Sequence, residues 1–146
     1  MMAKHESLRG LVAYPSDKRD VEIAVDNALT ELANQGIAND LEPWKESDIA
    51  GRFLVEPILD NIDAGNILIA DVTQLNFNVV FEIGYAIGSN KRVVLVRSSA
   101  HSRDADLVRR IGIFDTLGYK EYSDGSSLAE LIADIDDVQP LSVKSD

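Results

Sequence analysis

The sequence has no cysteine, few basic residues and no long apolar run. Without cysteine, the chain forms no disulfide framework and has no thiol chemistry. Its 14 Lys and Arg against 25 Asp and Glu leave a net charge of -11, which argues against a nucleic-acid partner, because phosphate binding relies on clustered Lys and Arg. No apolar run approaches the ~20 residues that span a bilayer, and the first ten residues have no signal-peptide core. We therefore expect a cytoplasmic protein with no nucleic-acid or membrane partner.

The chain also lacks the glycine-rich phosphate loops of P-loop and Rossmann proteins, since the turn at residues 14–17 reads YPSD. Classical NTPase or dehydrogenase activity is therefore not expected. His101, Asp104 and Asp106 match the spacing of no standard metal site, so no metal ion is expected. A small anionic ligand is still compatible with the charge, because helix N-termini and a few Arg residues bind phosphate locally.

Short apolar runs alternate with amphipathic segments along the chain. Strands are expected at residues 8–14, 37–44, 66–71, 92–96 and near 119–122. Helices are expected from residue 21 to the stop at Gly36, from about 52–64 with a regular start near 55 because of Pro57, at 78–89, weakly at 107–113, and from a capping box at 127–130. This alternation predicts an α/β fold, a flavodoxin-like doubly wound five-stranded parallel sheet in the order 2-1-3-4-5, with helices on both faces.

At 146 residues the chain is expected to be one domain over residues 1–137, followed by a tail at 138–146. Within the third expected helix, Gly84 and Gly88 stand four residues apart. We expect these two glycines to let the helix pack closely against its neighbour.

Glu82 is the only charged residue in the twelve-residue stretch FNVVFEIGYAIG at 77–88. A helix that is apolar nearly all round is normally buried, and a carboxylate there must be paired, protonated or used. The stretch lies between two apolar runs, so it predicts a βαβ crossover with Glu82 close to the carboxyl ends of the strands. Glu82 is therefore a candidate active-site group, and the alternative is a structural glutamate that pairs with Arg52 or Arg97.

Polar residues follow the expected ends of strands one, three and four. They are Tyr14, Ser16, Asp17, Asp71, Asn76, Asn78, Arg97 and Ser98. A desolvated carboxylate with amide and hydroxyl donors around it suits attack on, or stabilisation of, an electropositive sugar carbon, as in glycoside cleavage. Asp71 is equally suited to capping a turn, and Asn76 and Asn78 to turn and N-cap positions.

The segments IADVT at 69–73 and NFNVVFEIGYA at 76–86, followed by Lys91, resemble a signature shared by nucleoside 2-deoxyribosyltransferases and TIR-like nucleotide-binding domains. The resemblance is strongest over residues 48–96. It implies that Glu82 is the catalytic carboxylate that breaks an N-glycosidic bond, of a nucleoside in the first family and of NAD in the second. A nucleotide or nucleoside would then be the substrate, and no cofactor is expected.

The sequence departs from both families near the glutamate. Deoxyribosyltransferases carry an aspartate where this chain has Asn76, and a second one on the preceding helix at the position of Ile58. TIR-like domains usually carry a serine and a tryptophan where this chain has Asn76 and Asn78. The loop at 44–51, which contains Asp48, resembles the flexible TIR loop that helps form the nucleotide site, and the helix after it resembles the one that packs subunits together. This resemblance implies a substrate contact at Asp48 and a homo-oligomer.

The sequence therefore favours an NAD-type glycohydrolase in which Glu82 acts on the sugar, while Asp71, Asn76 and Asn78 orient the ribose. Tyr14, Ser16, Asp17, Arg97 and Ser98 would complete the pocket. A nucleoside 2-deoxyribosyltransferase is the alternative with the same chemistry. A non-catalytic nucleotide sensor or assembly module is the alternative from another class, motivated by the altered residues before Glu82.

Overall fold

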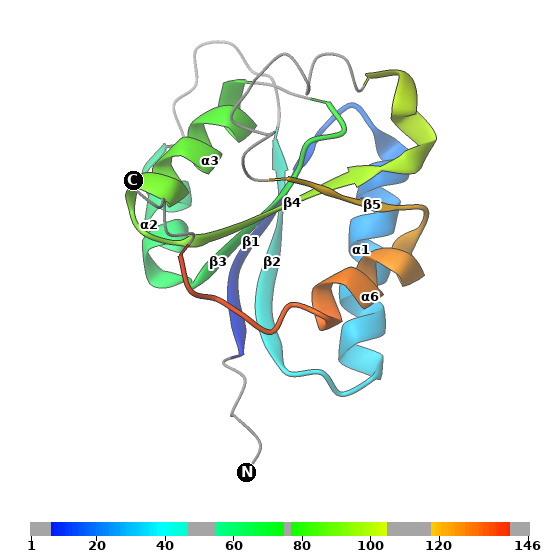
Figure 1. The fold of residues 1–146 in the computed structure, drawn as a ribbon, viewed down its shortest axis with the longest axis horizontal. Helices are drawn as coiled ribbons and strands as arrows, with labels where there is room; N and C mark the ends of the chain where they lie inside the picture. The colour runs from blue at the N-terminus through cyan, green and yellow to red at the C-terminus, as the bar shows by residue number, and fades with distance from the viewer. Residues whose placement is uncertain (1–6, 47–54, 75–76, 105–117, 141–146) are drawn as a thin grey trace, which may run out of the picture.

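A computed structural model of the protein describes residues 7–46, 55–74, 77–104 and 118–140 and contains one five-stranded parallel sheet in the order β2-β1-β3-β4-β5 (Figure 1). The strands are β1 (Leu8–Pro15), β2 (Asn39–Glu46), β3 (Ile67–Asp71), β4 (Arg92–Ser98) and β5 (Lys120–Tyr122). The helices are α1 (Arg19–Asn34), α2 (Val55–Ala64), α3 (Phe77–Gly88), the 3-10 helix η1 (Ser99–Asp104) and α6 (Gly125–Ala133). The predicted fold class and strand order are confirmed.

The helices cover the two faces of the sheet in pairs, α1 with α6 and α2 with α3 (Figure 1). We call these the α1/α6 face and the α2/α3 face. Successive side chains of a strand point to opposite faces. In β1, accordingly, Val12 packs in the core of the α1/α6 face, and Leu11 and Ala13 pack in the core of the α2/α3 face. The central strands are apolar on both faces, as expected for a parallel sheet that helices cover on both sides.

Gly10 lies in β1, where the strand runs between β2 and β3. Its φ of +153° is one that side-chain-bearing residues rarely adopt, and a Cβ at this position would lie 1.8 Å from the carbonyl oxygen of Ile67. Only a residue without a Cβ allows β1 and β3 to pair this closely. The central pairing of the sheet therefore depends on glycine at position 10.

Strand β2 begins two residues later than expected and ends at Glu46. After the turn at Gly36, the backbone N–H of Ile37 still donates to the carbonyl oxygen of Leu32 at 3.0 Å, so Ile37 closes the end of α1. Pairing with β1 then starts at Asn39, which lies opposite Leu8.

Strand β4 extends two residues beyond its expected end, because Arg97 and Ser98 pair with Glu121 and Tyr122 of β5. The polar stretch that follows begins with the 3-10 helix η1. The weak helix expected at 107–113 lies outside the described residues.

The last helix begins earlier than the capping box expected at 127–130. Asp124 is the N-cap residue, its carboxylate accepts from the Ser127 N–H at 2.8 Å, and the Ser127 hydroxyl accepts from the Asp124 N–H at 3.1 Å. Ser127 is therefore the third residue of the helix, and its assignment as the first capping residue was wrong.

The start of the expected tail packs against the domain. Val138 is half-buried against the core of the α1/α6 face, whereas residues 141–146 lie outside the described part of the chain. None of the described helices is both long enough and apolar enough to cross a membrane.

Replacing Gly10 by Ala should lower the free energy of unfolding by more than about 4 kcal/mol, because the new Cβ collides with the backbone of β3. The matched control is Gly36→Ala. Gly36 also has a positive φ, +70°, but nothing lies within 4 Å of its Cβ position, so the cost there should be only about 1–2 kcal/mol. Urea denaturation followed by circular dichroism measures both, and equal losses would contradict the close approach of β1 and β3.

Candidate active site

The strand order changes direction between β1 and β3. From β1 the chain crosses to β2 on one side, and from β3 it crosses to β4 on the other. Open α/β sheets bind ligands at the carboxyl ends of the strands at such a switch point. Here those ends lead into half-buried Ser16 and exposed Asp17 after β1, and into Thr73 and Gln74 after β3. The candidate site lies at this edge of the sheet.

Glu82 lies in the second turn of α3 and is only 2% exposed. Residues four apart lie on the same side of a helix, so Asn78 and Glu82 share one flank of α3. Tyr85 continues the same flank, and its hydroxyl donates to the two carboxylate oxygens of Asp63 at 2.9 and 3.0 Å. Because Asp63 belongs to α2, the flank that carries Asn78 and Glu82 faces α2. A carboxylate in this low-dielectric position interacts strongly with any charge that develops beside it.

Gln74 is a candidate site residue that the sequence did not single out. Its side-chain oxygen Oε1 is buried and accepts no hydrogen bond within the described part of the chain. A buried acceptor without a donor costs roughly 1–3 kcal/mol, and a ligand hydroxyl or amide would remove that cost. Only its place just after a buried strand could have indicated this residue.

Asp71 and Glu82 do not point into one crevice, contrary to expectation. Side chains alternate along β3, so Asp71 lies on the same face as Ile69, in the core of the α1/α6 face, whereas α3 covers the other face. Asp71 is fully buried. It accepts from the Thr73 N–H at 2.8 Å and from the Tyr122 hydroxyl. The arrangement is the turn cap that the sequence left as an alternative.

Burial raises the pKa of the Asp71 carboxyl above its ordinary value of 3.8, and the hydrogen bonds from Thr73 and Tyr122 offset this rise only in part. Burial, followed by the adjacent Asp71, also raises the pKa of the Tyr122 hydroxyl. Tyr122 therefore stays protonated and donates to Asp71 at every physiological pH.

Tyr14 and Ser98 also make contacts that stabilise the fold. Tyr14 is 5% exposed in the core of the α1/α6 face. Burial, and then Glu22 and Asp26 on α1, raise the pKa of its hydroxyl. The Ser98 N–H donates to the Thr73 hydroxyl at 2.9 Å, while the Ser98 hydroxyl accepts from the Ala100 N–H at 3.3 Å. Ser98 thus joins the ends of β3 and β4 to η1.

Arg97 is 2% exposed, although it is the last residue but one of β4. Its guanidinium lies over the Tyr119 ring at 5.6 Å, donates to the Tyr119 hydroxyl at 3.3 Å and to the His101 carbonyl at 3.2 Å, and pairs with Glu121 at 3.7 Å. These contacts explain how a buried charge is accommodated. Asp48, Asn76 and Arg52 lie outside the described residues, so the roles expected for them stay predictions.

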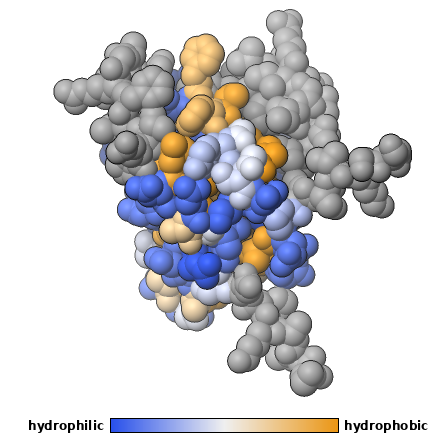
Figure 2. All heavy atoms as spheres, turned by 90° about the vertical axis from the view of Figure 1, so that its left-hand side faces the viewer, coloured by the Kyte–Doolittle hydropathy of each residue, from blue (hydrophilic) through white to orange (hydrophobic). Residues whose placement is uncertain are grey.

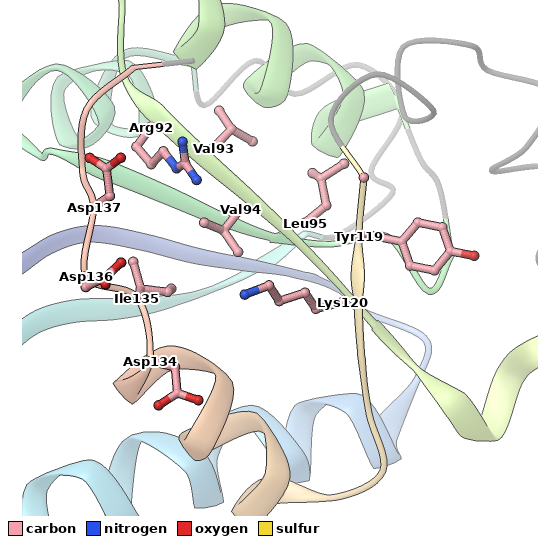
Figure 3. A pocket seen from close by; sticks show the side chains of 11 residues that line it. Arg92, Val93, Val94, Leu95, Tyr119, Lys120, Asp134, Ile135, Asp136 and Asp137 are labelled. Carbon is pink, nitrogen blue, oxygen red and sulfur yellow. The ribbon is translucent and has the colours of Figure 1, made fainter. Parts of the chain in front are cut away.

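A cavity of about 260 Å³ lies elsewhere, between β4, β5 and the chain after α6 (Figure 3). Arg92 and Lys120 and three carboxylates, Asp134, Asp136 and Asp137, surround its apolar wall. It extends from the amino end of β4 and is separate from the switch point. The described residues contain no group of three His, Cys, Asp or Glu side chains that could hold a metal ion. The Nε2 atom of His101 lies 2.7 Å from the Oδ2 atom of Asp20 on α1.

No protein-family model and no curated protein sequence matches the chain. Among solved structures, the fold is similar to the CMP N-glycosidase BcmB of Clostridium botulinum, with a TM-score of 0.55 and 15% sequence identity. The match covers 86% of this chain and 98% of that one. At this identity the likeness establishes a shared fold.

The raised pKa of Asp71 predicts how stability depends on pH. Because the folded pKa lies above 3.8, the contribution of Asp71 is fully present below pH 3.8 and is lost as the pH rises through the folded value. Asp71→Asn keeps the shape and cannot ionise, so it should gain stability relative to the parent as the pH rises. The gain should approach about 1.4 kcal/mol for each unit by which the pKa is raised.

Urea denaturation of parent and variant between acid and mildly basic pH measures this difference. Asp40→Asn, at an exposed carboxylate of β2, is the control. Parallel stability curves for the parent and Asp71→Asn would contradict a raised pKa.

Proposed function

We propose that this protein cleaves the N-glycosidic bond of a nucleotide and that Glu82 is the carboxylate that acts on the sugar. The observation that carries the proposal is the buried carboxylate of Glu82, on the helix that starts at the carboxyl edge of the sheet. Two facts support it. The fold is similar to that of a CMP N-glycosidase, and residues 76–86 resemble the glutamate helix of two families that break such bonds.

In the proposed reaction the bond between C1′ of the sugar and the base nitrogen breaks, and the base leaves with the electron pair. The sugar becomes oxocarbenium-like, and the Glu82 carboxylate stabilises this positive charge or bonds to C1′. Water then adds its oxygen to C1′. With a nucleoside monophosphate the water proton goes to the base, and the products are the free base and the sugar phosphate. With NAD the proton goes to solvent, and the products are nicotinamide and ADP-ribose.

The residues around the switch point would bind the rest of the nucleotide. Asn78 shares its helix flank with Glu82 and would orient the sugar hydroxyls together with Gln74, whose Oε1 is a buried acceptor. Ser16 and Asp17 border the same edge, and Lys18 follows them directly. Lys18 would supply positive charge for a phosphate at this edge. Because Glu82 is 2% exposed, substrate must displace the groups that cover the carboxylate.

Two substrates should be tested first. CMP is the substrate named for the structural neighbour, so a nucleoside monophosphate comes first. NAD comes second, because the sequence around Glu82 also resembles TIR-like domains. Release of cytosine or of nicotinamide distinguishes the two.

Glu82→Gln should lower kcat for base release by about 100-fold or more, because the neutral amide neither stabilises the sugar cation nor bonds to it. The assay separates free base from nucleotide by chromatography. Glu130→Gln, at an exposed glutamate on α6, is the matched control and should keep the parent rate.

Circular dichroism of each variant shows whether it is folded. Equal rates for Glu82→Gln and the parent would contradict the role of Glu82. A folded parent that binds CMP or NAD but releases no base would support the nucleotide sensor instead. Transfer of the sugar to an added free base would identify a transferase.

A further inference from the structure

Helix α3 exposes an apolar stripe on the side away from the sheet. Phe77 is 91% exposed and Phe81 50%, and Gly84 and Gly88 are exposed on the same stripe, with Ile87, 37% exposed, on its edge. Figure 2 views the molecule from the side of α3, where hydrophobic residues gather on the described surface. Large exposed aromatic residues in one row mark an interaction surface more often than scattered ones do.

The spacing of the stripe follows from helix geometry. Residues 77, 81, 84 and 88 are separated by four, three and four positions, so they lie in one row. Val79, Ile83 and Ala86 lie opposite and are buried. The one charged residue of the helix, Glu82, is also buried, so the outer side of α3 carries no charge in a chain whose net charge is -11.

The two glycines do not serve contacts within the chain. The sequence predicted that Gly84 and Gly88 let α3 approach its neighbour, but nothing lies within 4 Å of the Cβ position at either glycine, so that expectation was wrong. An exposed glycine inside a helix costs about 1 kcal/mol relative to alanine. Two of them in one row leave hollows beside the two projecting phenylalanines.

The stripe is complementary to itself. We propose that a second copy of this chain docks on it, with the two α3 helices antiparallel about a twofold axis midway between residues 82 and 83. Phe81 then faces Gly84 of the second copy, and Phe77 faces Gly88. In each pair the two residues are equally far from the axis, so each ring meets a hollow. A twofold contact requires such self-complementarity.

The ring of Phe81 is held in place before any partner binds. It stacks on Tyr85 with ring centroids 6.5 Å apart and an interplanar angle of 22°. The Tyr85 hydroxyl is in turn fixed by Asp63 of α2. A side chain that is already ordered loses less entropy on binding, which favours association.

Charge also favours this face for a second copy. Two chains that each carry -11 repel one another, so they approach best where neither presents charge. A helix of 12 residues is about 18 Å long and covers only part of a standard interface. We therefore expect a reversible dimer that salt strengthens by screening the repulsion. This contact is independent of the proposed chemistry, although it lies on the same helix.

The test exchanges the large and the small residue of one pair, Phe81 and Gly84. Phe81→Ala removes the ring and should raise the dimer dissociation constant about 30-fold or more. Gly84→Phe fills the hollow and should prevent dimerisation at the same concentrations. The double variant restores a ring opposite a small residue and should return to within about tenfold of the parent. Sedimentation velocity over a concentration series, at low and high NaCl, measures all four proteins.

Ile23→Ala is the matched control, because Ile23 is 48% exposed on α1, away from the stripe, and should dimerise like the parent. Circular dichroism melts check folding, and all substituted positions are exposed. A parent that is monomeric at its highest soluble concentration would overturn the proposal. So would single variants that dimerise like the parent, a double variant that does not recover, or a parent monomer that binds only detergent micelles through this face.

Discussion

The parallel pairing of β1 with β3 is the contact on which the rest of the structure depends. Gly10 makes it possible, because any Cβ there would overlap the Ile67 carbonyl oxygen. This pairing places β1 inside the sheet, between β2 and β3, so the chain leaves β1 and β3 in opposite directions. The switch point, and with it the candidate active site, exists only because these two strands are neighbours.

Three sides of helix α3 face different surroundings. Its inner side packs Val79, Ile83 and Ala86 against the sheet. One flank holds Glu82 and Asn78 toward α2, and the outer side carries the stripe proposed as a contact between copies. The one charged residue of α3, Glu82, is buried, so the helix presents no charge to solvent although the chain is strongly acidic. The proposed catalytic carboxylate and the proposed contact between copies thus lie on different sides of the same helix.

Much of the fold was predictable, because helices and buried strands have local signatures. The run at 66–71 and the periodic apolar residues after 21 each specify an element without reference to the rest of the chain. The ends of elements were less predictable, because they depend on partners. β4 reaches Ser98 only because β5 offers residues to pair with. α6 begins at Gly125 because Asp124 caps it: the Asp124 carboxylate accepts from the Ser127 N–H, and the Ser127 hydroxyl accepts from the Asp124 N–H.

The helices and strands, their succession along the chain and the unusual position of Glu82 follow from local sequence patterns, because the spacing of apolar residues is visible within a short window. Only the tertiary structure shows which of the polar residues lie close together. Strands buried on both faces show no polar alternation, so nothing local indicates that Asp71 points toward α1 and α6 whereas Glu82, on α3, lies on the other face of the sheet. Position along the chain brought these residues to one edge of the sheet, and the direction in which each side chain leaves the backbone placed them on opposite faces.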